Sequence, residues 1–136
     1  MGLTDEERAI LVALESEKAD KLIAEAEQIA ALRLWDAVAN RLYYAAFHAV
    51  SALLIKNKHA VNTHRGTVIT FGNFFVKTGI VSKDEGKLYS QLQSIRESGD
   101  YNCYIETTEA EILPKIAETK AFVATIQSLL KKGEPL

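Results

Sequence analysis

The chain has 136 residues and a net charge of −2, with 48% hydrophobic and 25% charged residues. This length and composition fit one globular domain over residues 1–136, and the near-neutral charge argues against a general nucleic-acid coat protein. The single cysteine, Cys103, excludes an intrachain disulfide and fits a reducing compartment. No apolar run approaches the roughly 20 residues that span a bilayer, and the acidic start lacks the apolar region of a signal peptide. We therefore expect a cytoplasmic protein with no membrane partner.

The first predicted element is a helix from about Asp5 to Ile29. Thr4 and Glu7 have the spacing of a capping box, in which a hydroxyl and a carboxylate satisfy each other's free amides. The same spacing at 82–85 and 108–111 predicts two further helix starts. Charged residues such as those of 15–18 are expected to form a solvated face. Apolar residues at helical spacing predict the buried stripe: Ile10, Leu11, Leu14, Leu22, Ala26 and Ile29.

The second predicted helix runs from about Leu32 to Lys56 and has little polar surface. A helix that is apolar on most sides is either central in the fold or part of a subunit interface. Alanines at positions 45, 46, 49 and 52 would allow another helix to approach closely. A polar loop from Asn57 to Thr63 follows.

A third helix is predicted from His64 to Lys77, closed by Gly79. Its apolar run could also form a strand, but an isolated strand would lack a partner, which favours a buried helix. A fourth helix is predicted from Lys83 to Ser98, because Gly99 fits the position just past a helix C-terminus.

The last predicted helix runs from Glu109 to about Lys131. Pro114 is expected either to kink its first turns or to delay its start. The fold class that follows is all-α: an antiparallel up-and-down four/five-helix bundle with four long helices and one shorter helix.

Positive charge is concentrated in the middle of the chain. Between positions 33 and 77 six basic residues stand against one acid, so this segment carries +5 and the remainder −7. This pattern predicts a local anion site, an acidic partner surface, or acidic outer helices packed against basic inner ones. The basic residues are Arg33, Arg41, Lys56, Lys58, Arg65 and Lys77, the acid is Asp36, and all three histidines, His48, His59 and His64, lie in the same segment.

The second helix carries a polar stripe. Arg41, Tyr44 and His48 fall at i, i+3 and i+7, so they share one face. A guanidinium, a phenol and an imidazole suit the binding of a phosphate or a base. The alternative is a buried polar network that fixes helix register. The sequence leaves open whether Tyr43, Tyr44 and His48 line a groove or the core.

Two further cationic positions lie at helix ends. His64 and Arg65 begin the third helix, where free amides favour an anion, unless Thr63 caps the helix and both side chains face solvent. Arg96 lies in the last predicted turn of the fourth helix. It could direct its guanidinium at a phosphate or simply pair with Asp100 near the helix dipole.

No metal or cofactor site is predicted. No two histidines lie four residues apart on a helix, and the single cysteine has no partner. Neither a glycine-rich phosphate loop nor a nucleophile elbow is present in the sequence.

Four short motifs occur in a recognisable order: Asn40-Arg-x-Tyr-Tyr-Ala-x-Phe-His48, His64-x-Gly66, Phe75-Val-Lys-Thr-Gly79 and Arg96-x-x-x-Asp100-Tyr101. Together, over roughly residues 30–130, they resemble the HEPN superfamily, and most closely its UPF0332-type branch. The resemblance implies an α-helical up-and-down bundle that usually forms homodimers. It also implies frequent pairing with a small nucleotidyltransferase in prokaryotic two-gene modules, often toxin–antitoxin systems.

Many HEPN proteins are metal-independent ribonucleases that use an arginine followed a few residues later by a histidine, with two copies meeting across the dimer. Arg96 matches that arginine, but no histidine follows it in this chain. Asp100 and Tyr101 occupy the region instead, and neither titrates like histidine near pH 7.

The resemblance, with its missing histidine, therefore predicts a non-catalytic nucleotide- or RNA-binding module that partners a nucleotidyltransferase and dimerises through the second and fourth helices. We expect the dimer groove to be lined by Arg96, Asp100 and Tyr101, with Arg41, Tyr44, His48 and His64 behind or beside it. One alternative is a metal-independent ribonuclease toxin in which Arg96 works with His48 or His64. Another is a structural helical dimer without a ligand.

Overall fold

A computed structural model describes residues 2–101, 104 and 106–132, without the side chains of Asp100 and Tyr101. All of the regular structure in these residues is helical. The all-α class is confirmed. In chain order the elements are α1 (Asp5–Ala30), α2 (Trp35–Lys56), α3 (His64–Phe71), the π-helix η1 (Gly72–Val76), α4 (Lys83–Tyr101) and α5 (Glu109–Leu130).

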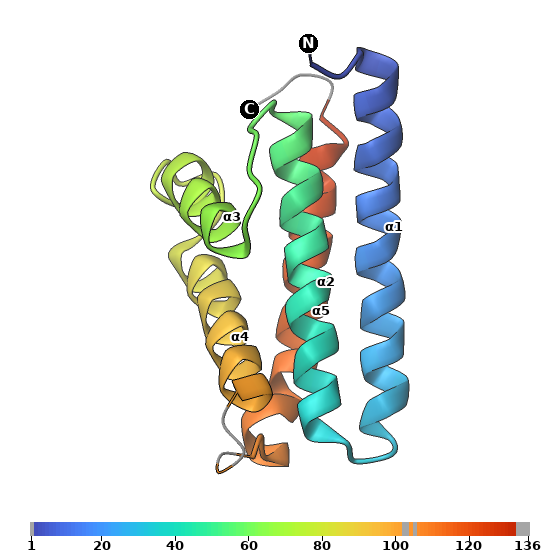
Figure 1. The fold of residues 1–136 in the computed structure, drawn as a ribbon, viewed down its shortest axis with the longest axis vertical. Helices are drawn as coiled ribbons and strands as arrows, with labels where there is room; N and C mark the ends of the chain where they lie inside the picture. Colours follow the sequence, from blue (N-terminus) through green and yellow to red (C-terminus); the bar gives the residue numbers. More distant parts are fainter. Residues whose placement is uncertain (1, 102–103, 105, 133–136) are drawn as a thin grey trace.

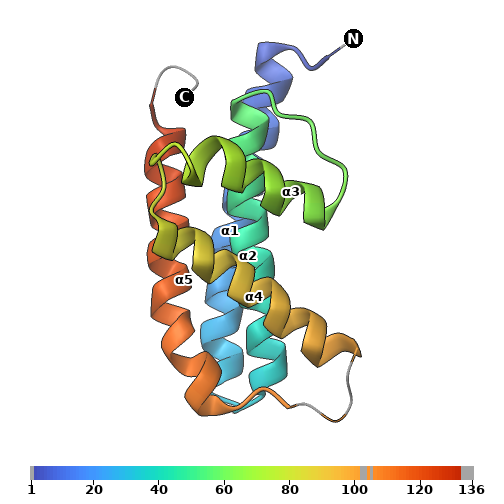
Figure 2. The ribbon, with the colours of Figure 1, turned by 90° about the vertical axis from the view of Figure 1, so that its left-hand side faces the viewer.

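The long helices form an up-and-down bundle. In Figure 1, α1, α2 and α5 stand along the long axis, and the chain direction alternates through α1, α2, α4 and α5. Figure 2 shows α4 crossing the bundle at an angle, with α3 lying across one end of it. α2 contacts α1, α4 and α5, so it is the central helix of the fold. No helix in the described part of the chain combines the length and the apolar character that crossing a bilayer requires.

The centre of the core is formed by α2, as its sparse polar surface predicts. Ala45, Ala46, Ala49 and Ala52 are all fully buried. Because these side chains are small, neighbouring helices approach α2 closely. Burial of each larger apolar side chain contributes about 2 kcal/mol relative to exposure. Eleven residues of α2 are buried: Val38, Ala39, Leu42, Tyr43, Ala45, Ala46, Ala49, Val50, Ala52, Leu53 and Leu54.

Side-chain caps begin three of the helices at the predicted positions. At α1 the Glu7 amide donates to Thr4 Oγ1 over 3.1 Å and the Thr4 amide donates to Glu7 Oε1 over 2.9 Å. Ser82 and Glu85 exchange the same pair of bonds before α4. At α5 the Glu111 amide donates to Thr108 Oγ1 over 3.2 Å. The three capping signals in the sequence therefore mark true helix starts.

Two helix ends differ from the sequence prediction. α2 begins at Trp35 and not at Leu32, because Arg33 has a left-handed φ of 58° that no α-helix accommodates. α4 continues to Tyr101, so Gly99 lies inside the helix and not beyond its end. In contrast to glycine at a true C-cap, Gly99 has no positive φ.

The segment that follows the polar loop is helical as predicted but changes its winding. α3 ends at Phe71, and in the π-helix that continues it the Lys77 amide donates to Gly72 O over 2.9 Å, five residues back. Gly79, with a φ of 82°, ends the segment as expected. The last helix begins at Glu109 and runs through Pro114, so the proline does not delay its start.

The N-terminal half of α1 departs most from the predicted burial. Ile10, Leu11 and Leu14 are 59%, 36% and 55% exposed, so their assignment to the buried stripe is wrong. The inward side of this half carries polar residues instead, because each has a partner on a neighbouring helix. Arg8 donates to Ile55 O, Glu15 contacts His48, and Ser16 accepts from Gln127. The expected solvated face at 15–18 is therefore also wrong for Glu15 and Ser16.

Acidic outer helices neutralise part of the basic segment. Arg33 pairs with Glu109 at 2.9 Å and Arg41 with Glu25 at 3.0 Å. Lys56 donates to the last carbonyls of α5, at 2.7 Å from Leu130 O. Other cations of the segment, Lys58, Arg65 and Lys77, remain exposed. The packing of acidic outer helices against basic residues is therefore confirmed for Arg33 and Arg41, and the anion site stays a prediction.

Candidate functional site

Two adjacent tyrosines of α2, Tyr43 and Tyr44, lie at the centre of the candidate site. Successive helix residues point about 100° apart, so Tyr43 faces the core while Tyr44 faces the edge of α2. Tyr43 is fully buried and Tyr44 is half-buried. Their rings meet edge to face with centroids 5.0 Å apart. Tyr43 thus belongs to the core, and Tyr44 lies at its rim.

Arg96 reaches these tyrosines from α4. Its guanidinium carbon lies 4.8 Å from the Tyr43 ring centroid and 5.6 Å from that of Tyr44. One guanidinium nitrogen is 3.5 Å from the Tyr44 hydroxyl, at the limit of a hydrogen bond. Contacts with two aromatic rings hold the guanidinium in one orientation, and arginine carries a positive charge that attracts anions.

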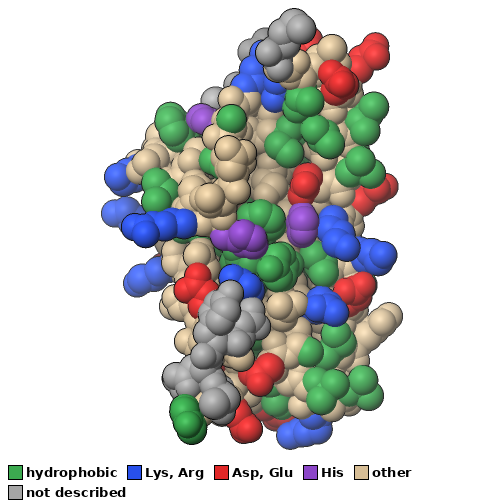
Figure 3. Space-filling model, viewed as in Figure 1, with side chains coloured by type: hydrophobic (Ala, Val, Ile, Leu, Met, Phe, Trp, Pro, Cys, Tyr) green, Lys and Arg blue, Asp and Glu red, His purple; other side chains and the backbone are tan. Residues whose placement is uncertain are grey.

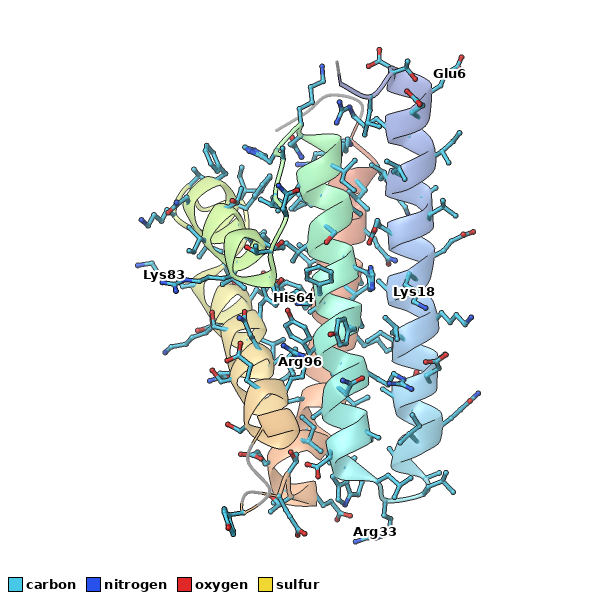
Figure 4. The ribbon with its side chains drawn as sticks, in the orientation of Figure 1. Glu6, Lys18, Arg33, His64, Lys83 and Arg96 are labelled. Atoms are coloured by element: carbon cyan, nitrogen blue, oxygen red, sulfur yellow. The ribbon has the colours of Figure 1, made fainter. Side chains whose placement is uncertain are left out.

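His64 reaches the same tyrosines from the start of α3. Its Nδ1 lies 2.5 Å from the Tyr43 hydroxyl, and its ring stacks on Phe47 with centroids 4.4 Å apart and planes 10° from parallel. Figure 4 shows His64 and Arg96 extending from separate helices toward α2. His64 therefore does not simply face solvent, as one interpretation of the sequence predicts.

The position of His64 is fixed by the cap of α3. Thr63 Oγ1 accepts from the Gly66 amide over 2.8 Å, which confirms Thr63 as the N-cap. A Cβ on residue 66 would lie 2.8 Å from that same oxygen, so only glycine fits without disturbing the cap. Arg65 is exposed. The His64-x-Gly66 motif thus orients the imidazole through the backbone.

Burial and nearby charge hold His64 neutral. Burial lowers its pKa below the usual 6.5, and the positive charge of Arg96 and then that of His48 lower it further, with Glu97 opposing them. Burial raises the pKa of Tyr43 to about 12, against the opposing effect of Arg96. At neutral pH the phenol keeps its proton and the imidazole carries no charge. Because Nδ1 is hydrogen-bonded to the Tyr43 hydroxyl, Nε2 is the ring nitrogen that a ligand can contact.

The polar stripe of α2 is divided between two neighbours. Tyr44 faces Arg96 and His64, whereas Arg41 pairs with Glu25 of α1 and donates to Asn40 Oδ1 over 2.8 Å. His48 contacts Glu15 of α1 and lies beside Tyr44. The structure therefore brings Tyr44, His64 and Arg96 together and places Arg41 away from them.

His48 connects α1 to an aromatic cluster, which consists of Tyr43, Tyr44, Phe47 and His64. Its Nδ1 is 2.6 Å from Glu15 Oε2, and its ring centroid lies 5.3 Å from Phe47 and 6.4 Å from Tyr44. Figure 3 shows histidine side chains beside hydrophobic and Lys/Arg side chains in the middle of this face. Sequence reasoning missed Glu15 in this role, since nothing in its spacing distinguishes it from a solvated acid.

The remaining expectations lie outside what the structure describes. Asp100 and Tyr101 belong to the last turn of α4, but their side chains are not among the described ones. Cys103 also lies outside the described residues. Within the described part of the chain, no cluster of His, Cys, Asp or Glu side chains is placed to hold a metal ion.

Comparisons with known proteins point to one family. The HEPN domain family model matches residues 14–129. A UPF0332 protein of Thermotoga maritima is 38% identical over 99 residues, covering 73% of this chain and 74% of that protein. A UPF0332 protein of Archaeoglobus fulgidus is 29% identical over 116 residues, covering 85% and 92%. A protein of Methanocaldococcus jannaschii named "Putative toxin MJ0605" is 35% identical over 97 residues, covering 71% of each chain.

Proposed function

Since this chain belongs to the HEPN domain family and to its UPF0332-like branch, we propose that it is a nucleotide- or RNA-binding module whose phosphate site is formed by Arg96, His64 and the Tyr43–Tyr44 pair. The observation that carries the proposal is the convergence of Arg96 and His64, from two helices, on the same two tyrosines. An oriented guanidinium binds phosphate oxygens, and half-buried aromatic rings stack with bases.

We place the proposed homodimer interface on the open stripe of α2 and on α4. The half-buried residues of that stripe lie between α1 and α4: Asn40, Arg41, Tyr44, Phe47 and His48. Two copies meeting there would bring two Arg96 side chains to one groove. We propose that Asp100 and Tyr101 line the same groove, as the resemblance implies.

A small nucleotidyltransferase is the proposed partner, in a toxin–antitoxin-like pair. Two similar proteins of Methanocaldococcus jannaschii carry the word toxin in their names, which supports this context. Co-purification of the two gene products tests the partnership. A neighbouring nucleotidyltransferase that fails to co-purify would count against it.

A second candidate, RNA cleavage, is favoured by one specific observation. The missing motif histidine has a spatial substitute, because His64 lies on the tyrosines that hold Arg96 and its lowered pKa makes it a base at neutral pH. In this reaction His64 Nε2 takes the proton of a ribose 2′-hydroxyl, whose oxygen attacks the adjacent phosphorus. The 5′-oxygen leaves with a proton from solvent, and a cyclic phosphate remains. Arg96 stabilises the charge on the phosphate.

One set of variants separates these functions. Purified protein is incubated with single-stranded RNA and EDTA, and both binding and cleavage are measured for wild type, Arg96→Ala, His64→Ala and Arg65→Ala. A binding module loses affinity in Arg96→Ala and cleaves nothing. A ribonuclease loses cleavage in both Arg96→Ala and His64→Ala. The exposed Arg65 is the matched cation outside the cluster, and its removal should change neither function beyond a modest salt-dependent loss. If wild type neither binds nor cleaves RNA, the ligand-free structural dimer is favoured.

A further inference from the structure

A pocket of about 580 Å³ adjoins the candidate site on the side away from Arg96. It lies between the start of α1, the C-terminal half of α2 and the loop that leads into α3. Phe47 and His64 belong to both the aromatic cluster and the wall of this pocket, and Glu15, which contacts His48, also lines it. The volume is within the range of pockets that hold small molecules.

The lining of the pocket combines the groups that a nucleotide needs. Leu54 and Val61 give it an apolar wall, next to the rings of Phe47 and His64. Asn62 on the loop offers an amide that can both donate and accept hydrogen bonds. Positively charged side chains line one side of the pocket. The pocket therefore has a surface for a base, a group that can contact its edge, and positive charge for a phosphate.

Two cations, Arg8 and Lys58, line this pocket, and both also line the neighbouring pocket between α1 and α5. Arg8 donates to Ile55 O over 2.7 Å, so part of its guanidinium secures the end of α2, while its Nε is buried without a hydrogen bond. The Lys58 ammonium has no hydrogen bond or ion pair to any residue that the structure describes. Its charge is therefore available to an anion.

The backbone of Lys58 is in a conformation that favours glycine. Its φ is 63°, and the amides of Lys58 and His59 donate to Ile55 O and Leu54 O, which closes α2 in a Schellman motif. Glycine adopts this left-handed conformation without strain, whereas lysine adopts it at a cost. A bland explanation is that a cation stabilises the helix C-terminus. Under that explanation Lys58→Gly lowers Tm and leaves the affinity for a ligand unchanged, whereas a ligand-binding role predicts a weaker affinity.

We infer that this pocket binds one nucleotide, with the base against Phe47, Leu54 and Val61 and the phosphate at Lys58 and Arg8. The inference deepens the proposed function and rests on it for the class of ligand. The nucleotide has two sources: a free mononucleotide, or one unit of an RNA strand that continues to His64 and Arg96.

The test measures binding of AMP by calorimetry and of a short single-stranded oligoadenylate by fluorescence anisotropy, with adenosine and inorganic phosphate as partial ligands. Lys58→Gly should raise Tm by a few degrees, because backbone strain is relieved, while it weakens binding about fivefold or more. Asn62→Asp, which adds a negative charge on the exposed loop, should also weaken binding without unfolding the chain.

Arg33→Gly is the matched control. Arg33 is the other non-glycine residue with a positive φ in the described part of the chain, at 58°, and it lies at the opposite end of the bundle, in contact with Glu109 (Figure 4). Its replacement by glycine relieves the same kind of backbone strain. It also removes a surface ion pair, which contributes little to stability. Tm should not fall, and the affinities for AMP and RNA should be those of the wild type.

The outcomes distinguish a free-nucleotide site, a site for one unit of an RNA strand, and failure of this inference. AMP binding that is lost in Lys58→Gly supports a free-nucleotide site, even if RNA does not bind and the phosphate site proposed at Arg96 fails. RNA binding that weakens in Lys58→Gly, without AMP binding, supports a unit of the strand. RNA binding that depends on Arg96 but not on Lys58, without AMP binding, overturns this inference and leaves the proposed function standing. A lower Tm for Lys58→Gly with unchanged affinities also overturns it, in favour of the helix-end explanation.

Discussion

The hydroxyl of Tyr43 lies 2.5 Å from Nδ1 of His64, and this bond ties the buried centre of α2 to the first residue of α3. Tyr43 is fully buried, so its position is set by the packing of the core. The hydrogen bond from the core therefore fixes the His64 ring, while the Thr63 cap places its backbone at the start of α3. A ring held in this way presents Nε2 in one direction, which is the preorganisation that a binding site needs.

Tyr43→Phe should destabilise the protein by about 1 kcal/mol, because it removes one buried hydrogen bond and leaves His64 Nδ1 without its partner. The free energy of unfolding in urea measures this loss. Tyr104→Phe is the control, since Tyr104 is 94% exposed and substitutions at exposed positions usually change stability little. Equal stability of the two variants would contradict the bond between Tyr43 and His64.

His64 should make stability depend on pH in the acidic range. Its pKa in the folded chain lies below the usual 6.5 because of burial and the charges of Arg96 and His48. As pH falls below about 6.5, the unfolded chain takes up a proton before the folded chain does, so the free energy of unfolding falls until the folded pKa is reached.

Side-chain NMR titration measures that pKa directly. Arg96→Ala should raise the pKa of His64 toward its usual value, because a nearby positive charge is removed. In His64→Gln the part of the pH dependence due to this residue should vanish, as seen in urea unfolding at several pH values. A pKa of His64 at or above the usual value in the wild type would contradict the described environment.

Thr63→Ala should cost about 1 kcal/mol of stability and also weaken binding at the proposed phosphate site, because the cap that Thr63 provides orients the first turn of α3. Thr108→Ala removes the equivalent cap of α5, far from His64 in the chain. It should cost a similar free energy and leave RNA affinity unchanged. Comparing both variants by urea unfolding and RNA titration separates loss of a cap from loss of the site. Equal effects on RNA affinity would show that His64 does not depend on its cap.

The exposed apolar residues of α1 should contribute little to the stability of a single chain. Ile10→Ser, at a side chain that is 59% exposed, should change the free energy of unfolding by less than about 0.5 kcal/mol. Leu22→Ala, at a side chain that is 6% exposed, should cost about 3 kcal/mol because it leaves a cavity. A large, concentration-dependent loss in Ile10→Ser would instead show that this face is covered by another chain.

Local signals in the sequence determined most of the helices. Thr4, Ser82 and Thr108 each begin a helix because a cap and its partner lie three residues apart, so no distant contact is needed. The central place of α2 also follows from sequence, since a helix with apolar residues on most sides must be buried. The residues that resemble the HEPN motifs include Tyr44, His48, His64 and Arg96, which lie in or beside the aromatic cluster.

Only the tertiary structure decided which of those residues meet. The helical spacing of Arg41, Tyr44 and His48 places them on one stripe, but the stripe faces two helices, so Arg41 pairs with α1 while Tyr44 meets Arg96 of α4. Polar partners likewise turned Arg8 and Glu15 inward in α1 and left Ile10 and Leu14 outside.

The contacts that define the site join residues far apart in the chain. His64 reaches Tyr43 across 21 positions, and Arg96 reaches Tyr44 across 52. Periodicity and capping act over a few residues, so they determine what each helix is and where it begins. The distance between Arg96 and His64 depends on how α3 and α4 cross α2, and that crossing is set by the packing of all their side chains at once.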